Sequence, residues 1–555
     1  MAHLFRAYRA KDVSFSAYFI ESTAPDNVED RIKPPPVPPQ LVAVDADQAI
    51  DDIAAELGDS DAPNLVIMVH GFNNPPPAVF KFYASAAAAI DRDPSITGRK
   101  GLVCVGYCWP SEKMGTPLPS WRSALPTMAT WLGRFGLIIL LCGIILIVLR
   151  SAWYLAAWLD PSLHQMAATL AIRPWIKDAL SVFGHALALS GLFIAGLIFC
   201  AILLRIIVYF RDGYRATNYG APDLIEIIRQ IDRRIVDHDG KHRRANREAR
   251  RVQLSFIGHS MGGFVVTNAI RVLSDVFDVG AISARLNAGL INEQNAVRFS
   301  ADASAPDLSP HIGHAFSLMR FVLASPDIPA EALISNRANF LASSLRRFRE
   351  AHLFSNEGDE VLRQISTVAN YFSFPTKSWK FGFRLGNVEI LSSGYGIIPV
   401  ARQAILATLR IGYYTLQEIY ERLRAARGRS EDGEDLGTLQ NKLPERFSYF
   451  DCTDYVDTDN DGNQRPLLTF ALRLKQHNPH ARMSWRQHLC LLESYLWNGK
   501  PDVHAGYFQG MLAQQLIYRL ACLGYAGTIA AYGGTPQLSQ LCRDKQVRVL
   551  LSPSL

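Results

Sequence analysis

The chain contains a serine between closely spaced glycines, in the segment GHSMGG at residues 258–263. The apolar segment VQLSFI precedes it and FVVTNAIRVL follows it. A strand, a Gly-x-Ser-x-Gly turn and a helix make up the nucleophile elbow, where the chain reverses so sharply that glycines are needed on both sides of the serine. The pattern predicts that Ser260 lies at the C-terminal end of a strand with its hydroxyl exposed. The positive end of the next helix dipole should point at it.

A serine hydroxyl is a weak nucleophile, so this chemistry needs a histidine as base and a carboxylate that orients the histidine. It also needs two backbone N–H groups that stabilise the oxyanion. One is the N–H of Met261, directly after the serine. The other should come from a turn after an earlier strand, and the segment VIMVHGFNN offers Phe72, our choice, or Asn73. We interpret His70, which precedes this turn, as a structural histidine that anchors the loop.

The segments around these motifs alternate between the patterns of strands and helices. This alternation predicts an α/β fold, with a mainly parallel sheet covered by helices. The expected strands cover residues 15–20, 64–72, 101–110, 251–258, 319–328, 350–359 and 446–456. The expected helices cover residues 45–57, 80–90 and 221–235.

Two strongly apolar segments interrupt this alternation. Residues 135–149 lie between Arg134 and Arg150, and residues 179–204 carry no formal charge. A bilayer span needs about 20 apolar residues. The second segment meets this length, and the first does so if Arg150 snorkels or the span extends into the aromatic residues after it. We therefore predict an inserted two-helix transmembrane hairpin within residues 115–213. A pair of buried core helices, or an apolar hairpin in the membrane interface, is the alternative.

Charge and composition suggest where the rest of the chain lies. Arginines concentrate on the parts that flank the hairpin, so the positive-inside bias predicts two spans with the catalytic part in the cytoplasm. The eight cysteines form no CxxC pair, which favours reduced thiols in the same compartment. The N-terminus lacks the pattern of a secretory signal. A net charge of +6 over 555 residues, without a clearly basic face, gives no indication of a nucleic-acid partner.

Several short motifs together resemble a known group of proteins. HGFNN, YCWPSE, GHSMGG, LASPDI, SNEGDEVL, RLG and VHAGYF occur in this order. They resemble an uncharacterised bacterial group of lipase- or esterase-like serine hydrolases in the alpha/beta-hydrolase superfamily. The chain has SPD where that group tends to have APD. The resemblance covers most of the chain outside the apolar hairpin and the region after about Arg402. It implies an alpha/beta-hydrolase fold and serine-dependent ester hydrolysis, with no established substrate.

The resemblance also suggests the other two members of a triad, in the chain order Ser, acid, His. Asp359 follows the segment HLFSNEG at 352–358, where related families often place the carboxylate after the penultimate strand. Asp327 is the alternative, in a position that some lipases use, and we expect the carboxylate that is not used to cap a helix. The base that we choose is His504, which lies in a turn before a helix and precedes an aromatic residue. Weaker candidates for the base are His477, His480 and His488.

These features divide the chain into five parts. Residues 1–114 and 214–400 are expected to form the two parts of the hydrolase domain, with the hairpin at 115–213 between them. Residues 401–446 are interpreted as a helical insertion and possible lid. Residues 447–555 should hold the last strand, the catalytic histidine and the C-terminal helices.

We therefore hypothesise a membrane-anchored serine hydrolase that cleaves carboxylic esters, with a lipid-like or acyl-ester substrate and an acyl-enzyme intermediate. No cofactor or metal is expected. The segment DTDNDG at 457–462 resembles the start of a calcium loop, but Leu468 stands where that loop needs a glutamate. One alternative from another class is a catalytically silent scaffold or signalling protein. A peptidase or thioesterase with the same triad is a further alternative, and the sequence does not indicate an oligomeric state.

Overall fold

The computed structural model of the protein describes most of the predicted hydrolase domain. The described residues are 4–24, 37–111, 138, 142–145, 189–192, 196, 209–242, 251–276, 310–329, 344–345, 347–366, 384–392, 396–399, 446–458, 462–469, 483–494 and 501–552. The chain divides into two compact units. The first contains Met1–Lys113, Val208–Leu492 and Lys500–Leu555, and the second contains Met114–Ile207 and Glu493–Gly499. All elements discussed below belong to the first unit.

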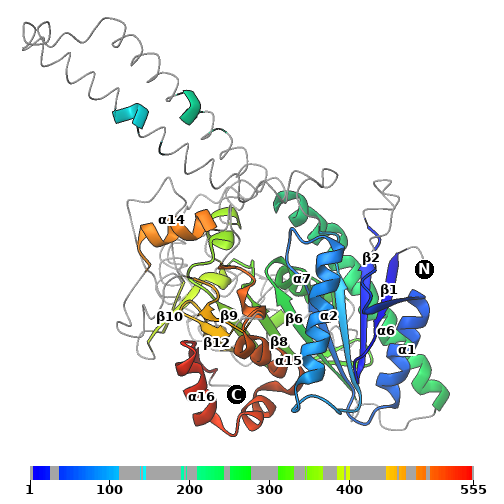
Figure 1. Cartoon of the computed structure of the whole chain (residues 1–555). Helices are drawn as coiled ribbons and strands as arrows, with labels where there is room; N and C mark the ends of the chain where they lie inside the picture. Colours follow the sequence, from blue (N-terminus) through cyan, green and yellow to red (C-terminus); the bar gives the residue numbers. More distant parts are fainter. Residues whose placement is uncertain are drawn as a thin grey trace, which may run out of the picture. The chain divides into compact units, whose positions relative to one another are not determined.

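A largely parallel sheet forms the centre of this unit (Figure 1). It has 11 strands, in the order β15-β12-β9-β8-β6-β4-β5-β2-β1-β3, with β7 paired to β8. The parallel strands are β2 (Ser16–Ser22), β4 (Asn64–Val69), β5 (Leu102–Cys108), β6 (Val252–His259), β8 (Phe316–Ala324), β9 (Glu350–Ser355) and β12 (Phe447–Asp451). The prediction of a mixed α/β fold with a mainly parallel sheet is thus confirmed.

Antiparallel strands complete the sheet, and the sequence patterns did not predict them. They are β1 (Phe5–Ala10), β3 (Leu41–Val44), β7 (His311–Ile312) and β15 (Arg548–Leu550). Strand β15 pairs with β12, so β12 is not the last strand of the chain as we expected. These strands are short or half-exposed, so the run of apolar residues that marks a buried parallel strand is missing from them.

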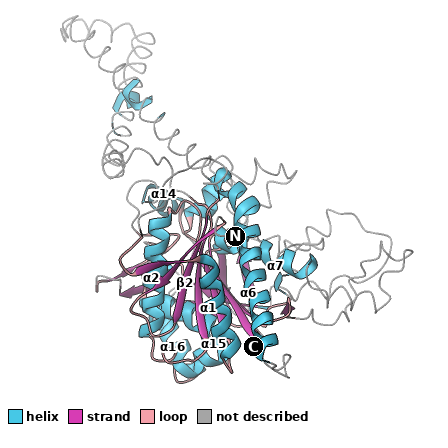
Figure 2. Ribbon diagram, turned by 90° about the vertical axis from the view of Figure 1, so that its right-hand side faces the viewer, coloured by secondary structure: helices cyan, strands magenta, loops and turns pink. Residues whose placement is uncertain are grey.

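Helices cover both faces of the sheet, which explains why its central strands are apolar throughout. In β4, for example, Leu65, Val66 and Ile67 are completely buried. Figure 2 shows the sheet between α2 (Pro76–Arg92) on one side and α6 (Ala221–His242) with α7 (Met261–Val276) on the other. On these two sides, α1 (Ala46–Asp59) packs against α6, and α15 (Met511–Ala531) packs against α2.

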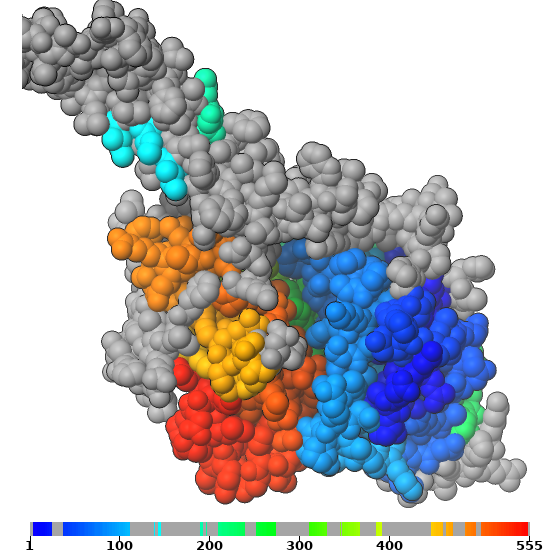
Figure 3. Space-filling model, in the orientation of Figure 1, coloured from blue at the N-terminus to red at the C-terminus, as the bar shows by residue number. Residues whose placement is uncertain are grey.

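The C-terminal part of the chain returns to the middle of the sheet. Helix α15 contacts β8, β6, β4 and β9, and α16 (Thr535–Asp544) then leads to β15. Figure 3 shows C-terminal residues in red and orange beside the light blue residues of α2 on one face of the unit. A long-range ion pair secures this packing, because Arg519 of α15 binds Asp93 at the end of α2 at 2.6 Å. Residues just before α15 meet the ends of β6 and β9, through the hydrogen bonds of His259 to His504 and of Asn356 to Val503.

Two small hairpins lie outside the main sheet. Strands β10 (Val388–Ser392) and β11 (Gly396–Pro399) form one, and β13 (Val456–Thr458) and β14 (Gln464–Pro466) form the other. The second hairpin includes the start of the calcium-like segment, where the carboxylate of Asp457 binds Tyr455, Lys545 and the N–H of Leu512. Among the described residues, no cluster of His, Cys, Asp and Glu side chains has the arrangement of a metal site.

Several predictions fall largely on residues that the structure does not describe. They are the two apolar segments at 135–149 and 179–204, the insertion at 401–446, and the histidines His477 and His480. Within the described ranges, no helix combines the length and the apolar character that a bilayer crossing requires. The transmembrane hairpin remains a prediction from the sequence.

A glycine in the centre of the sheet permits a test of this core. A Cβ atom on Gly106 of β5 would lie 2.5 Å from the Tyr83 ring and 2.6 Å from the Phe19 ring. We expect Gly106→Ala to lower the free energy of unfolding by about 1–3 kcal/mol through overpacking, measured as a lower urea midpoint. Gly213→Ala is the control, because open space surrounds that position. An unchanged midpoint in Gly106→Ala would contradict the packing described here.

Candidate active site

Ser260 lies at a sharp turn between β6 and α7. Its backbone φ is 55°, in the left-handed region that residues other than glycine rarely adopt. Hydrogen bonds hold this conformation: the N–H of Ser260 donates to the carbonyl of Ala324 at 3.0 Å, and its carbonyl accepts from Asp327 at 3.1 Å. The strained backbone of the serine is therefore fixed by the end of β8 and the loop that follows it.

Three glycines make room for this turn. A Cβ atom on Gly258 would lie 2.7 Å from the Cα of Gly263, and one on Gly262 would clash with two backbone carbonyl oxygens at the end of β4. On the opposite side, a Cβ on Gly71 would lie 2.7 Å from the Cβ of Ser260. The backbone after β4 and the serine are thus in direct contact, and side chains are excluded from the space between them.

His504 binds a buried carboxylate. Its Nδ1 lies 2.7 Å from Oδ2 of Asp359, and both side chains are largely buried. Burial lowers the pKa of His504, but the charge of Asp359 and the hydrogen bond to it raise the pKa, and the net effect is a raised pKa. With Nδ1–H donating to Asp359, Nε2 has no hydrogen-bond partner among the described residues, and the same holds for Oγ of Ser260. No hydrogen bond joins these two atoms in this structure.

Asp359 has two roles, one for each of its carboxylate oxygens. Its Oδ1 accepts from the N–H groups of Val361 and Leu362, at 3.1 and 3.2 Å, and so caps the π-helical turn η4 (Val361–Ser366). Its Oδ2 faces His504 and also accepts from the hydroxyl of Ser325. The cap fixes the carboxylate, so its position toward the imidazole is set before any ligand binds.

Asp327, the alternative acid, is used differently. It forms a buried ion pair with Arg384 at 3.2 Å and accepts from the hydroxyl of Ser366 at 3.0 Å. We expected the carboxylate not bound to the histidine to cap a helix, but the cap that the structure shows belongs to Asp359 itself, whereas Asp327 binds Arg384 and Ser366. Arg384 comes from the RLG motif, which gives that motif a structural role beside the site.

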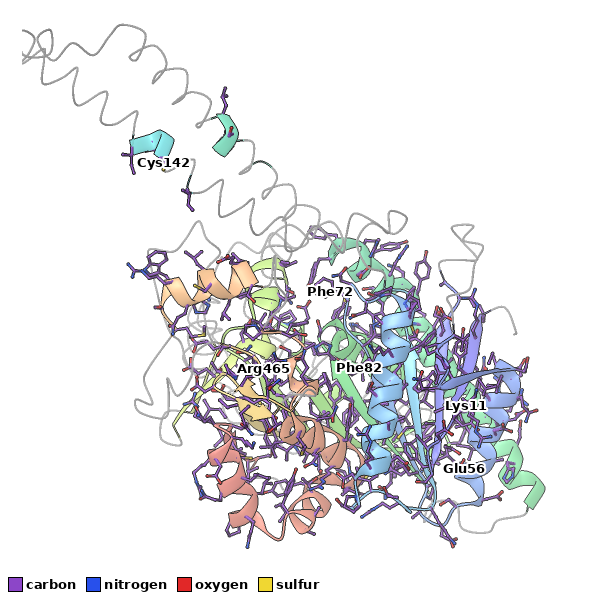
Figure 4. All side chains as sticks on the ribbon, in the orientation of Figure 1. Lys11, Glu56, Phe72, Phe82, Cys142 and Arg465 are labelled. Atoms are coloured by element: carbon purple, nitrogen blue, oxygen red, sulfur yellow. The ribbon has the colours of Figure 1, made fainter. Side chains whose placement is uncertain are left out.

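The two predicted oxyanion donors occupy suitable places. Met261 is the first residue of α7, and Phe72 lies in the turn after β4, where Figure 4 labels it. The N–H of Asn73, the other residue that the sequence offered, donates instead to the carboxylate of Asp212 at 2.8 Å. Within the described ranges, no hydrogen bond from the N–H of Phe72 or Met261 is found. Phe72 is therefore the better candidate of the two turn residues.

His70 anchors this turn, as we interpreted it from the sequence. Its Nδ1–H donates to the carbonyl of Gly71 at 2.7 Å, and its ring stacks on Trp109 with ring centroids 5.3 Å apart. Burial lowers its pKa to about 4, so the ring is neutral at physiological pH. The carbonyl of Gly71 belongs to the same peptide group as the N–H of Phe72. The bond from His70 therefore also orients that N–H.

His259 is a site residue that we missed. Its Nε2–H donates to the carbonyl of His504 at 3.1 Å, and the two ring centroids lie 4.9 Å apart. Burial, followed by the neighbouring His504, lowers the pKa of His259 to about 3, so it acts as a neutral donor. Asp502 holds the same turn by accepting from the N–H groups of His504 and Ala505. The GHS and PDVH segments contain these residues, but neither segment indicates which residue it binds.

His488, a weaker candidate for the base, does not bind the proposed acid. It lies in α14 (Trp485–Glu493), and its Nδ1 binds Glu360, the residue after Asp359. Among the described residues, the imidazole that the structure brings to Asp359 is that of His504. The other two candidates, His477 and His480, lie outside the described residues.

The contact between His504 and Asp359 can be tested by titration. We expect Asp359→Asn to lower the pKa of His504, because the charge and the hydrogen bond that raise it are lost while burial remains. The pKa can be measured by NMR of histidine-labelled protein. Asp327→Asn is the matched control, since Asp327 contributes least among the charges that raise this pKa, and it should cause a smaller decrease. An unchanged pKa in Asp359→Asn would contradict the observed pairing.

The chain matches no protein-family model, no curated protein and no solved structure. The fold is therefore described as a mixed α/β unit with a largely parallel sheet. Any activity must be inferred from the chemistry of the site itself.

Proposed function

We propose that this protein is a serine hydrolase of the alpha/beta-hydrolase type that cleaves carboxylic esters. The observation that carries the proposal is the pair of His504 and Asp359, joined at 2.7 Å beside the strained turn of Ser260. Oγ of Ser260 and Nε2 of His504 are buried, and within the described part of the chain neither has a hydrogen-bond partner. Buried polar atoms normally have a partner, so unsatisfied ones need an explanation. A substrate that engages both atoms provides one.

The proposed mechanism uses only groups of this chain. Oγ of Ser260 attacks the ester carbonyl while Nε2 of His504 takes its proton, and Asp359 stabilises the imidazolium that forms. The N–H groups of Met261 and Phe72 stabilise the oxyanion of the tetrahedral intermediate. His504 then gives the proton to the leaving alcohol, which produces an acyl-enzyme. In the second half, His504 activates a water molecule that releases the acid and restores Ser260.

We further propose that the substrate is a lipid-like or acyl ester taken from a membrane. The apolar segments at 135–149 and 179–204 support this proposal, since they would anchor the protein with its catalytic part in the cytoplasm. The aromatic rings next to His504 and His259 also favour a substrate with an apolar group. The ring of Phe72 lies 6.5 Å from that of His504, and the ring of Phe508 lies 5.4 Å from that of His259.

One observation favours a second candidate function. Our expectation that the hydroxyl of Ser260 would be exposed was wrong, because the residue is completely buried. A substrate therefore reaches this hydroxyl only after part of the chain moves. Under our first proposal, a lid would make this movement, and we retain the insertion at 401–446 as the hypothesised lid. Under the second, the protein is a catalytically silent scaffold or signalling component that keeps the fold and never exposes the serine.

Covalent labelling separates the two functions. The full-length protein in detergent should react with a fluorophosphonate probe, and Ser260→Ala should abolish the reaction because the nucleophile is removed. Ser255→Ala is the matched control: this buried hydroxyl lies on β6, which leads into Ser260, has no hydrogen-bond partner among the described residues, and should not affect labelling. Wild-type protein that is folded but unlabelled would support the scaffold.

The pH dependence of ester hydrolysis provides a further test. The reaction needs the neutral form of His504, whose pKa is raised above its ordinary value of 6.5. The kcat/KM of the wild type should therefore rise with pH and level off only above pH 6.5. Asp359→Asn should shift this rise to lower pH and reduce kcat by about 10⁴-fold. A pH profile that is the same with and without the Asp359 carboxylate would be incompatible with its assigned role.

A further inference from the structure

Asp212 is a buried carboxylate that binds the turn after β4. Its side chain has no exposed surface. Its Oδ2 accepts from the N–H of Asn73 and from the hydroxyl of Ser111, both at 2.8 Å, and its Oδ1 binds the guanidinium of Arg211 at 2.8 Å. Asn73 has a φ of 59°, which is strained for a residue that is not glycine. A charge-assisted hydrogen bond therefore holds a strained residue directly after the proposed oxyanion donor Phe72.

Hydrogen bonds of the side chains around Asp212 connect it to the rest of the turn. The hydroxyl that donates to Asp212, that of Ser111, accepts from the N–H of Asn74 at 3.2 Å. The side-chain amide of Asn74 donates to the carbonyls of Gly71 and Phe72, at 3.2 and 3.0 Å. The peptide groups on both sides of Phe72 are thus held by bonds that connect back to Asp212.

Tyr209, three residues before Asp212, contacts the same site from the same helical segment. Its ring packs edge-on against that of Phe72, with centroids 5.6 Å apart. Burial raises the pKa of the Tyr209 hydroxyl, and the charge of Asp327 raises it further. The N–H of Asp327 in turn donates to the carbonyl of Ser260. Residues 209–215 therefore contact the oxyanion turn through both Tyr209 and Asp212.

A π-helical turn places this segment. Residues 209–215 are helical, and η1 (Ala216–Gly220) separates them from α6. The end of β5 holds η1, because the hydroxyl of Tyr107 donates to the carbonyl of Gly220 at 2.9 Å. A Cβ on Gly220 would lie 3.3 Å from the Cβ of Trp109. Single π-helical turns of this kind occur frequently at functional sites.

We propose that Asp212 is a positioning residue that fixes the oxyanion-binding N–H of Phe72. The helical segment at 209–215 then determines how well the transition state is stabilised. This inference rests on the proposed hydrolase function. It also links the active site to the apolar segment at 179–204, because residues 209–215 follow that segment closely in the chain.

The test compares Asp212→Ala and Asp212→Asn in the full chain. The substrate is a p-nitrophenyl ester of a fatty acid, and the inhibitor is an alkyl trifluoromethyl ketone. The ketone forms an oxyanion with the serine, so its affinity reports the oxyanion donors. Loss of one oxyanion donor lowers kcat by about 10²–10³-fold, so a misplaced donor in Asp212→Ala should lower kcat by about 10- to 100-fold. KM should stay nearly constant, and the inhibition constant should rise by the same factor as kcat falls. Asp212→Asn keeps an acceptor for the N–H of Asn73, so its kcat should fall less than that of Asp212→Ala.

Two further variants make the outcome decisive. Asp93→Asn is the matched control, since it also breaks a buried ion pair, that with Arg519, and should lower stability without changing kcat or the inhibition constant. If Asp212→Ala does not fold, Ser111→Ala replaces it, because this variant removes the hydroxyl that joins Asn74 to Asp212. Ser111→Ala is expected to show the same parallel change in kcat and inhibition constant.

The possible failures can be told apart. A folded Asp212 or Ser111 variant with wild-type kcat and inhibition constant would overturn the positioning role and leave the hydrolase function intact. If kcat and inhibitor affinity fall equally in the Asp93→Asn control, lower stability alone accounts for the effect, and the positioning role of Asp212 is also overturned. A folded wild type without labelling at Ser260 would overturn the proposed function and this inference together.

Discussion

The close approach of two backbone segments is the constraint on which the site depends. The first turn of α7 packs so tightly against the end of β4 that a methyl group at Gly262 would clash with its carbonyl oxygens. Gly71 lies in the turn after β4 and touches Ser260, so there is no space for a side chain at this position either. This contact accompanies the positive φ of Ser260, and because β4 and β6 are parallel neighbours, Phe72 and Met261 lie at the same edge of the sheet. A bulkier residue at either glycine would push the backbone after β4 away from Ser260 and the first turn of α7.

Burial of charge imposes a second constraint. A carboxylate buried without a partner is costly, so each acid of the site must be satisfied. Asp359 is satisfied by the cap of η4, by Ser325 and by His504, and Asp327 by Arg384 and Ser366. Each assignment also fixes a loop, because the partners come from separate segments of the chain: η4, the loop after β8, the turn before α15 and the RLG segment. The two carboxylates of the site are therefore held in place by their partners, whereas Oγ of Ser260 and Nε2 of His504 have none among the described residues.

The helical segment at 209–215 connects this rigid site to the rest of the chain. It is the first described segment after the apolar residues 179–204. It reaches the oxyanion turn through Asp212 and Tyr209. If those apolar residues lie in a membrane, as the sequence predicts, the same segment joins the anchor to the catalytic turn. The proposed lipid-like substrate and the proposed positioning role then concern neighbouring parts of one chain.

The sequence by itself determined the features that depend on neighbouring residues. The glycine spacing around Ser260 predicted its turn, and continuous apolar runs predicted the central parallel strands. The short antiparallel strands such as β15 were missed because their stability comes from pairing with the sheet edge rather than from their own pattern. Only the tertiary structure decided which carboxylate meets His504, since 145 residues separate it from Asp359. The same holds for Asp212, 139 residues from Asn73, because such contacts arise from packing that no local pattern encodes.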